Sequence, residues 1–74
     1  MKHIDVFTAK VADNKGTESC IETARRKSII EGRTVCIMSN GTDINAVHFE
    51  HTEEFEKEGY WVAYTFENGH AVYA

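Results

Sequence analysis

Residues 34–47 read TVCIMSNGTDINAV, and this stretch decides the fold because a tight chain reversal separates two apolar runs. Asn40-Gly41 readily supplies the positive φ angles of a two-residue turn and is the strongest short-range signal for a β-hairpin. With these residues at the turn, Ser39 pairs with Thr42 and Ile37 with Ile44. Side chains alternate across a sheet, so the two faces of this hairpin are predicted directly. One face carries Val35, Ile37, Ile44 and Ala46, and the other carries Thr34, Cys36, Met38 and Val47.

A second Asn-Gly pair, Asn68-Gly69, lies between residues 60–67 and 70–74 and predicts a second hairpin. The expected pairs are Glu67 with His70, Phe66 with Ala71, Thr65 with Val72, and Tyr64 with Tyr73. Strict alternation then places Val62, Tyr64, Phe66, Ala71 and Tyr73 on one face, and Trp61, Ala63, Thr65 and Val72 on the other. Both hairpins are therefore substantially apolar on both faces.

The remainder of the chain predicts one strand and one helix ahead of the hairpins. Residues 2–12 have the pattern of a strand, and 13–16 that of a loop. A helix is expected to open at Thr17 or Ser19, because Ser19 and Glu22 match a capping box, and to stop at Gly32. Its apolar stripe is narrow and small, comprising Cys20, Ile21, Ala24 and Ser28.

The predicted element order is therefore β-α-β-β-β-β, with later strands at roughly 33–39, 43–50, 60–67 and 70–74. This is an α+β domain, residues 1–74, with a single helix packed on a mainly antiparallel five-stranded sheet. Residues 51–59 leave two alternatives open. They form either a short acidic helical turn after Thr52 or an extension of the third strand that turns at Glu58-Gly59.

One narrow helix covers only one side of such a sheet. The other side still carries apolar residues, and soluble monomers seldom expose a large contiguous apolar patch. We therefore infer a surface for a partner or for self-association there. The alternative is that long side chains and the acidic linker fold across that side.

Composition narrows the class of function. The chain has 12 acidic and 8 basic residues, a net charge of −4, which argues against a general nucleic-acid binder. No apolar run reaches the length of a membrane span, and the N-terminus lacks the apolar core of a secretory signal, so we expect a cytoplasmic protein. Cys20 and Cys36 then resemble small buried hydrophobes more than a disulfide pair.

No pattern in the sequence indicates catalysis, a cofactor or a metal. His48 and His51 stand three apart, so on a strand they point to opposite faces and do not share one ion. Neither cysteine has the context of an activated thiolate, and a chain of 74 residues leaves little scaffold for a substrate cavity. We therefore expect a protein without enzymatic activity, cofactor or metal.

Three groups of residues are candidates for binding. Trp61 is either an anchor for a partner or a core residue packed against the helix. The acidic stretch is either solvated surface or a patch that steers a basic partner, and it comprises Glu53, Glu54, Glu56 and Glu58. A basic helix end is either solvated or a contact for nucleic-acid phosphates, and it comprises Arg25, Arg26, Lys27 and Arg33.

The segment Tyr60-Trp61-Val62-Ala63-Tyr64, continuing through Gly69 to Val72, resembles the end of a family of small phage anti-CRISPR proteins that act on type I-F surveillance complexes. The length and element order of this chain are similar as well. The resemblance implies a stoichiometric inhibitor of a host nucleoprotein complex, working in the host cytoplasm. The acidic linker departs from the basic contacts associated with that family and favours docking on a basic protein groove.

These observations predict a small binding protein that inhibits or modulates a host protein or nucleoprotein complex. A small nucleic-acid-binding regulator that uses the basic helix end is the alternative. A homodimeric structural module is a third class.

Overall fold

The computed structural model describes residues 5–72 and confirms the predicted α+β class. The elements are β1 (Asp5–Lys10), α1 (Asn14–Ile30), β2 (Val35–Ser39), β3 (Asp43–His48), η1 (Phe49–His51), α2 (Thr52–Glu56), β4 (Trp61–Glu67) and β5 (His70–Val72). The strands form one sheet in the order β1-β3-β2-β4-β5, and every pairing is antiparallel. The 3₁₀ turn η1 and the short helix α2 are added between β3 and β4.

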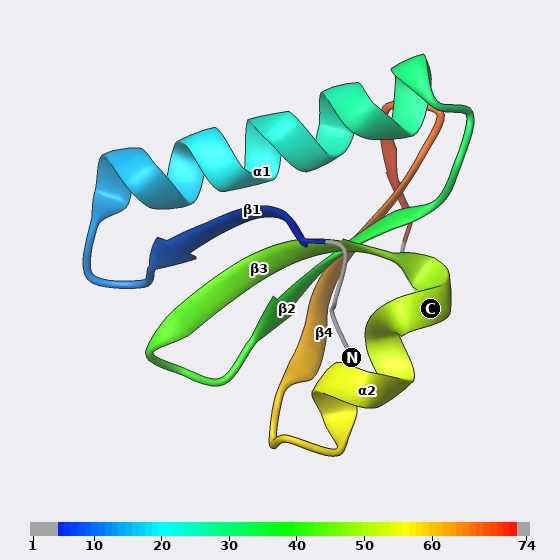
Figure 1. Cartoon of the computed structure of the whole chain (residues 1–74). Coiled ribbons are helices and arrows are strands. Elements are labelled where there is room, and N and C mark those ends of the chain that lie inside the picture. The colour runs from blue at the N-terminus through cyan, green and yellow to red at the C-terminus, as the bar shows by residue number, and fades with distance from the viewer. Residues whose placement is uncertain (1–4, 73–74) are drawn as a thin grey trace.

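The sheet lies between two helical layers (Figure 1). Helix α1 crosses one face, and η1 with α2 lies against the other. The core on the α1 side contains Cys20, Ala24, Val35, Ile37, Ile44, Ala46 and Phe66. The core on the α2 side contains Cys36, Met38, Val47 and Phe55, with Tyr60 packed against it. Apolar residues on both faces of the central strands are thus buried.

The first hairpin has the predicted faces but not the predicted register. Ser39 pairs with Ile44 and Ile37 with Ala46, a displacement of two residues from the expected pairs. The reason is a wider turn, in which Asn40 Oδ1 accepts hydrogen bonds from the backbone N–H groups of Thr42 and Asp43 at 2.9 and 2.8 Å. Side chains repeat every two residues along a strand, so a shift of two leaves each of them on its face. The predicted faces are confirmed for the residues within β2 and β3, and Thr34 lies before β2.

In the second hairpin the register is as predicted, but the predicted faces are wrong for the first two residues of β4. Thr65, Phe66 and Glu67 pair as expected, and Asn68 and Gly69 have φ angles of 52° and 83°. The Tyr64–Tyr73 pair lies outside the described residues. On the other side of β4, however, Ile37 pairs with Tyr64 and Met38 with Val62, which leaves Ala63 as an extra residue in a β-bulge.

The bulge corrects the predicted faces of the first two residues of β4. Trp61 pairs with Ser39, on the same face as Ile37, so it lies on the α1 side together with Tyr64 and Phe66. Val62 pairs with Met38 and lies on the α2 side. A strict period of two predicted the opposite placement for both residues, because it assumed a strand without an insertion.

Helix α1 begins earlier than predicted. Asp13 is its N-cap, and the Asp13 carboxylate accepts a 3.1 Å hydrogen bond from the backbone N–H of Gly16. The predicted start at Thr17 or Ser19 is therefore wrong by about one turn. At the other end Gly32 has a φ of 62°, which confirms the predicted left-handed stop. Among residues 5–72, no helix combines the length and the apolar character needed to cross a membrane.

The structure also decides between the two alternatives for residues 51–59. They begin with a helical turn, α2, and its one buried residue, Phe55, is only 3% exposed. Phe55 contacts the core of Cys36, Met38 and Val47, each at most 1% exposed. The expected open face is therefore absent over β2 and β3, because the acidic linker folds across it.

Candidate functional site

Exposed apolar side chains remain at the β4 side of the sheet. We call the hairpin of β4 and β5, residues 61–72, the wing. Within it, large apolar side chains are exposed on both faces: Trp61, Val62, Tyr64 and Val72, between 40% and 53% exposed. Neither helix covers them. The wing is therefore the part of the described sheet that carries an exposed apolar surface.

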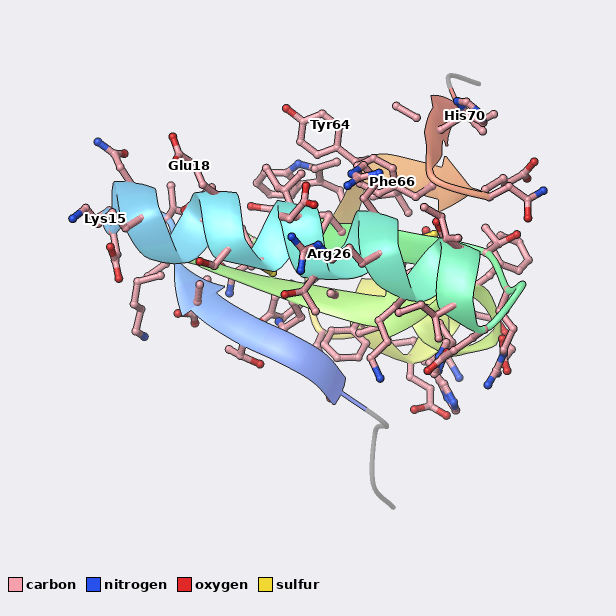
Figure 2. The ribbon with its side chains drawn as sticks, turned by 90° about the horizontal axis from the view of Figure 1, so that it is seen from above. Lys15, Glu18, Arg26, Tyr64, Phe66 and His70 are labelled. Atoms are coloured by element: carbon pink, nitrogen blue, oxygen red, sulfur yellow. The ribbon has the colours of Figure 1, made fainter. Side chains whose placement is uncertain are left out.

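Three aromatic side chains of the wing lie on its α1 face: Trp61, Tyr64 and Phe66. Tyr64 stacks on the buried Phe66 with ring centroids 6.3 Å apart, and both lie along the flank of α1 that faces β4 and β5 (Figure 2). Trp61 stands on the same face near the first hairpin turn, where a Cβ built on Gly41 would lie 3.7 Å from Trp61 Cη2. Trp61 is 53% exposed, so the alternative prediction that it is a core residue packed against the helix is wrong.

The wing is attached to α1 through Ser28. This residue is fully buried, its hydroxyl donates to the Arg25 carbonyl at 2.6 Å, and it accepts from the Gly69 backbone N–H at 2.8 Å. The turn also packs closely, because a Cβ on Gly69 would lie 2.6 Å from Ile29 Cδ1. These contacts hold the β4–β5 turn against the last turns of α1.

We expect Ser28→Ala to destabilise the protein by about 1–2 kcal/mol, because the Gly69 N–H loses its partner in a part-buried position. The amide of Gly69 should exchange with deuterium faster, as measured by NMR, while amides of β3 remain protected. Ser19→Ala, on the exposed part of the same helix, is the control. An unchanged exchange rate at Gly69 would show that Ser28 does not hold the turn.

The four predicted acidic residues lie in or after α2, and they do not gather around Trp61. Glu53 and Glu56 line a hollow on the α2 side together with Val62, whereas Trp61 projects from the opposite face of β4. Glu54 lies 4.0 Å from His51 Nδ1, and Glu58 is in the loop before β4. The acidic patch and the predicted anchor are thus near one end of β4 but on different faces.

Two residues of that hollow, Phe49 and Val62, were not predicted as binding residues. Phe49 was assigned to the third strand, but η1 begins there and Phe49 is 60% exposed. Val62 reaches this face only through the bulge at Ala63. The sequence carries no local signal for that bulge, because its cause is pairing with the distant strand β2.

The four basic residues that form the predicted alternative site, a contact for nucleic-acid phosphates, are each paired with a carboxylate. Glu22 accepts hydrogen bonds from Arg25 at 3.1 and 2.6 Å and from Arg26 at 2.9 Å. These bonds, with Arg25 first, lower the pKa of Glu22 to about 2. Likewise, Lys27 bonds Glu31 and Arg33 bonds Glu50. A nucleic-acid phosphate would have to compete with the carboxylates that these cations already contact. The arrangement therefore does not favour nucleic-acid binding by these residues.

His48 belongs to a structural contact between β3 and the end of α1. Its side chain is 6% exposed, and Nε2 lies 2.7 Å from Glu31 Oε1. The ring of His51 is 6.5 Å away between centroids. Within residues 5–72 there is no group of three or more His, Cys, Asp or Glu side chains arranged to hold a metal ion.

This contact predicts a pH dependence of stability. The hydrogen bonds from His48 and then Lys27 hold the pKa of Glu31 below its ordinary value of 4.5. A carboxyl whose pKa is lower in the folded state stabilises the fold above its unfolded pKa and loses that effect as the pH falls through the folded pKa. We expect Glu31→Gln to cost about 1 kcal/mol at pH 7.

That difference should shrink as the pH falls from about 5 toward 3. Urea denaturation of both proteins at several pH values measures it. Glu22 titrates in both proteins, so its contribution cancels in the comparison. A difference that stays constant down to pH 3 would contradict the role given to the Glu31 carboxylate.

Both cysteines are buried free thiols, as predicted. Cys20 belongs to the core on the α1 side and Cys36 to the core on the α2 side, so the sheet separates them. Burial raises the pKa of Cys20 to about 11 and also raises the pKa of Cys36. Thiols of this kind are poor nucleophiles at neutral pH.

No family model, curated protein or solved structure matches this sequence significantly. The most distinctive part of the described surface is the wing, which has exposed aromatic residues on one face and borders the acidic hollow at Val62 on the other.

Proposed function

We propose that this chain is a small, non-enzymatic binding protein that inhibits or modulates a larger host protein or nucleoprotein complex. The observation that carries the proposal is the exposure of Trp61 and Tyr64, 53% and 42%, on the α1 face of the wing, where they pair with Ser39 and Ile37 of β2. Tryptophan and tyrosine dominate binding hot spots, because each buries a large area and keeps one polar group. Trp61 is the anchor of this surface.

The acidic residues around α2 have a different role. Glu53, Glu54, Glu56 and Glu58 lie beyond the same end of β4, and electrostatic attraction acts over about 10 Å at 0.1 M salt. They need not touch the partner to accelerate its approach. The partner is therefore a protein with a basic surface, and its association rate falls as salt rises.

The experiment begins with a pull-down from a bacterial lysate, followed by purification of the captured protein and measurement of its affinity. Trp61→Ala and Tyr64→Ala should each weaken that affinity, Trp61→Ala by about 30-fold or more. Ile30→Ala is the matched control, because Ile30 is 79% exposed in the last turn of α1 and does not belong to the wing. An affinity unchanged by Trp61→Ala would exclude the wing as the docking surface.

The resemblance to phage anti-CRISPR proteins supports a narrower form of the proposal, in which the target is a type I-F surveillance complex in the host cytoplasm. Expression of the chain in a bacterium with an active type I-F system should then restore plaque formation by a targeted phage. Trp61→Ala, checked for equal expression, should restore far fewer plaques. If the unmodified chain restores none, the target is another host protein.

A further inference from the structure

A hollow of about 420 Å³ opens on the α2 side, where η1, α2 and the start of β4 meet. Its apolar part is formed by Phe49, 60% exposed, and Val62, 41% exposed. The other lining residues are polar: Glu50, Thr52, Glu53 and Glu56. An apolar surface of this size beside three carboxylates is suited to a ligand that is itself part apolar and part charged.

The charge around the hollow is negative and incompletely balanced. Arg33 pairs with Glu50, so one guanidinium already sits at the edge of the hollow. Within residues 5–72, Glu53 and Glu56 have no cationic partner. A second hollow, along α1, has a balanced charge, because its lining contains two carboxylates, Glu18 and Glu22, and two cations, Lys15 and Arg26. Charge complementarity thus points to a cation at the α2 hollow rather than at the hollow along α1.

We propose that the α2 hollow receives an arginine or lysine side chain from a basic segment of the protein partner. The methylene stem packs on Val62 and on the ring of Phe49, and the cationic head reaches Glu53 and Glu56. An anion is repelled there, and a purely apolar side chain would take the carboxylates out of water without pairing them. This assignment rests on the proposed binding function and names the chemistry of the partner.

An NMR titration tests the hollow without the partner. The probes are N-acetyl-arginine methylamide and its citrulline counterpart, which has nearly the same shape and no charge. We expect the arginine probe to shift the Val62 methyl and Phe49 ring signals with a dissociation constant on the order of 1–10 mM, and the citrulline probe to shift them much less. Equal shifts from both probes, or none from either, would overturn the proposal.

Variants show where the arginine probe binds and whether its binding depends on the wing. Glu53→Gln combined with Glu56→Gln should weaken the affinity for the arginine probe by about fivefold, and Phe49→Ala should weaken it by about threefold. Glu18→Gln combined with Glu67→Gln removes the same charge elsewhere and should leave the constant unchanged. Trp61→Ala should also leave it unchanged, so failure at the hollow and failure of the docking function remain distinguishable. Shifts of Val62 that follow protein concentration alone would identify a second copy as the occupant and overturn the assignment.

Discussion

Phe55→Ala is expected to lower the free energy of unfolding by about 3–5 kcal/mol, close to the whole stability of a domain of this size. Phe55 is the one buried residue of α2, and its ring packs edge-on against Tyr60 with centroids 5.3 Å apart. Without the Phe55 ring, α2 has few contacts that hold it on the sheet. Cys36, Met38 and Val47 also lose the side chain that packs over them. Urea denaturation followed by circular dichroism measures the effect.

Phe49→Ala is the matched control, because this ring lies in the same linker but is 60% exposed. Its effect on stability should stay within about 0.5 kcal/mol. If the two variants lose equal stability, α2 is not a structural cover. If Phe55→Ala is as stable as the wild type, the α2-side core contributes nothing and the layered description of the fold is wrong.

Ala24→Leu is expected to destabilise the protein by about 3 kcal/mol through overpacking. Cys20, Ala24 and Ser28 have no exposed surface, and they form the small-residue stripe on which α1 approaches the sheet. A leucine at the centre of that stripe must displace Ile37, Ile44 or the helix itself. A displaced helix would also strain the contact between Ser28 and Gly69.

Thr23→Leu adds a larger apolar side chain at the neighbouring position, which borders an open hollow on α1. It should change the free energy of unfolding by less than about 1 kcal/mol. Thermal and urea denaturation of both variants provide the comparison. An Ala24→Leu protein with wild-type stability would mean that α1 can move away from the sheet at no cost.

The fold class was predictable because its signals are local. Asn68-Gly69 marked a turn with two positive φ angles, Gly32 marked the end of α1, and alternation marked the faces of the first hairpin. Even the wrong register at Asn40 left those faces intact, because it slipped by two residues. The start of α1 was missed because Asp13, a good N-cap, was assigned to a loop.

The candidate site was less predictable. Trp61 and the four glutamates of residues 53–58 were predicted from their residue types and their place in the sequence. Their arrangement in space, however, depends on β4 and α2, whose conformations are set by contacts with residues distant in the sequence. Phe49 was assigned to a strand, and Val62 to the wrong face. The hollow that these two residues form therefore had no signal in the sequence.

Turn chemistry and apolar alternation, both read within a few neighbouring residues, were enough to establish two hairpins, one helix and an antiparallel sheet. Two features required the assembled molecule. A five-residue helix is too short to be stable alone, and α2 exists because Phe55 is buried on the sheet. The bulge at Ala63 arises where β4 pairs with Ile37 and Met38, more than twenty residues earlier, and it determines on which face of the sheet Trp61 lies.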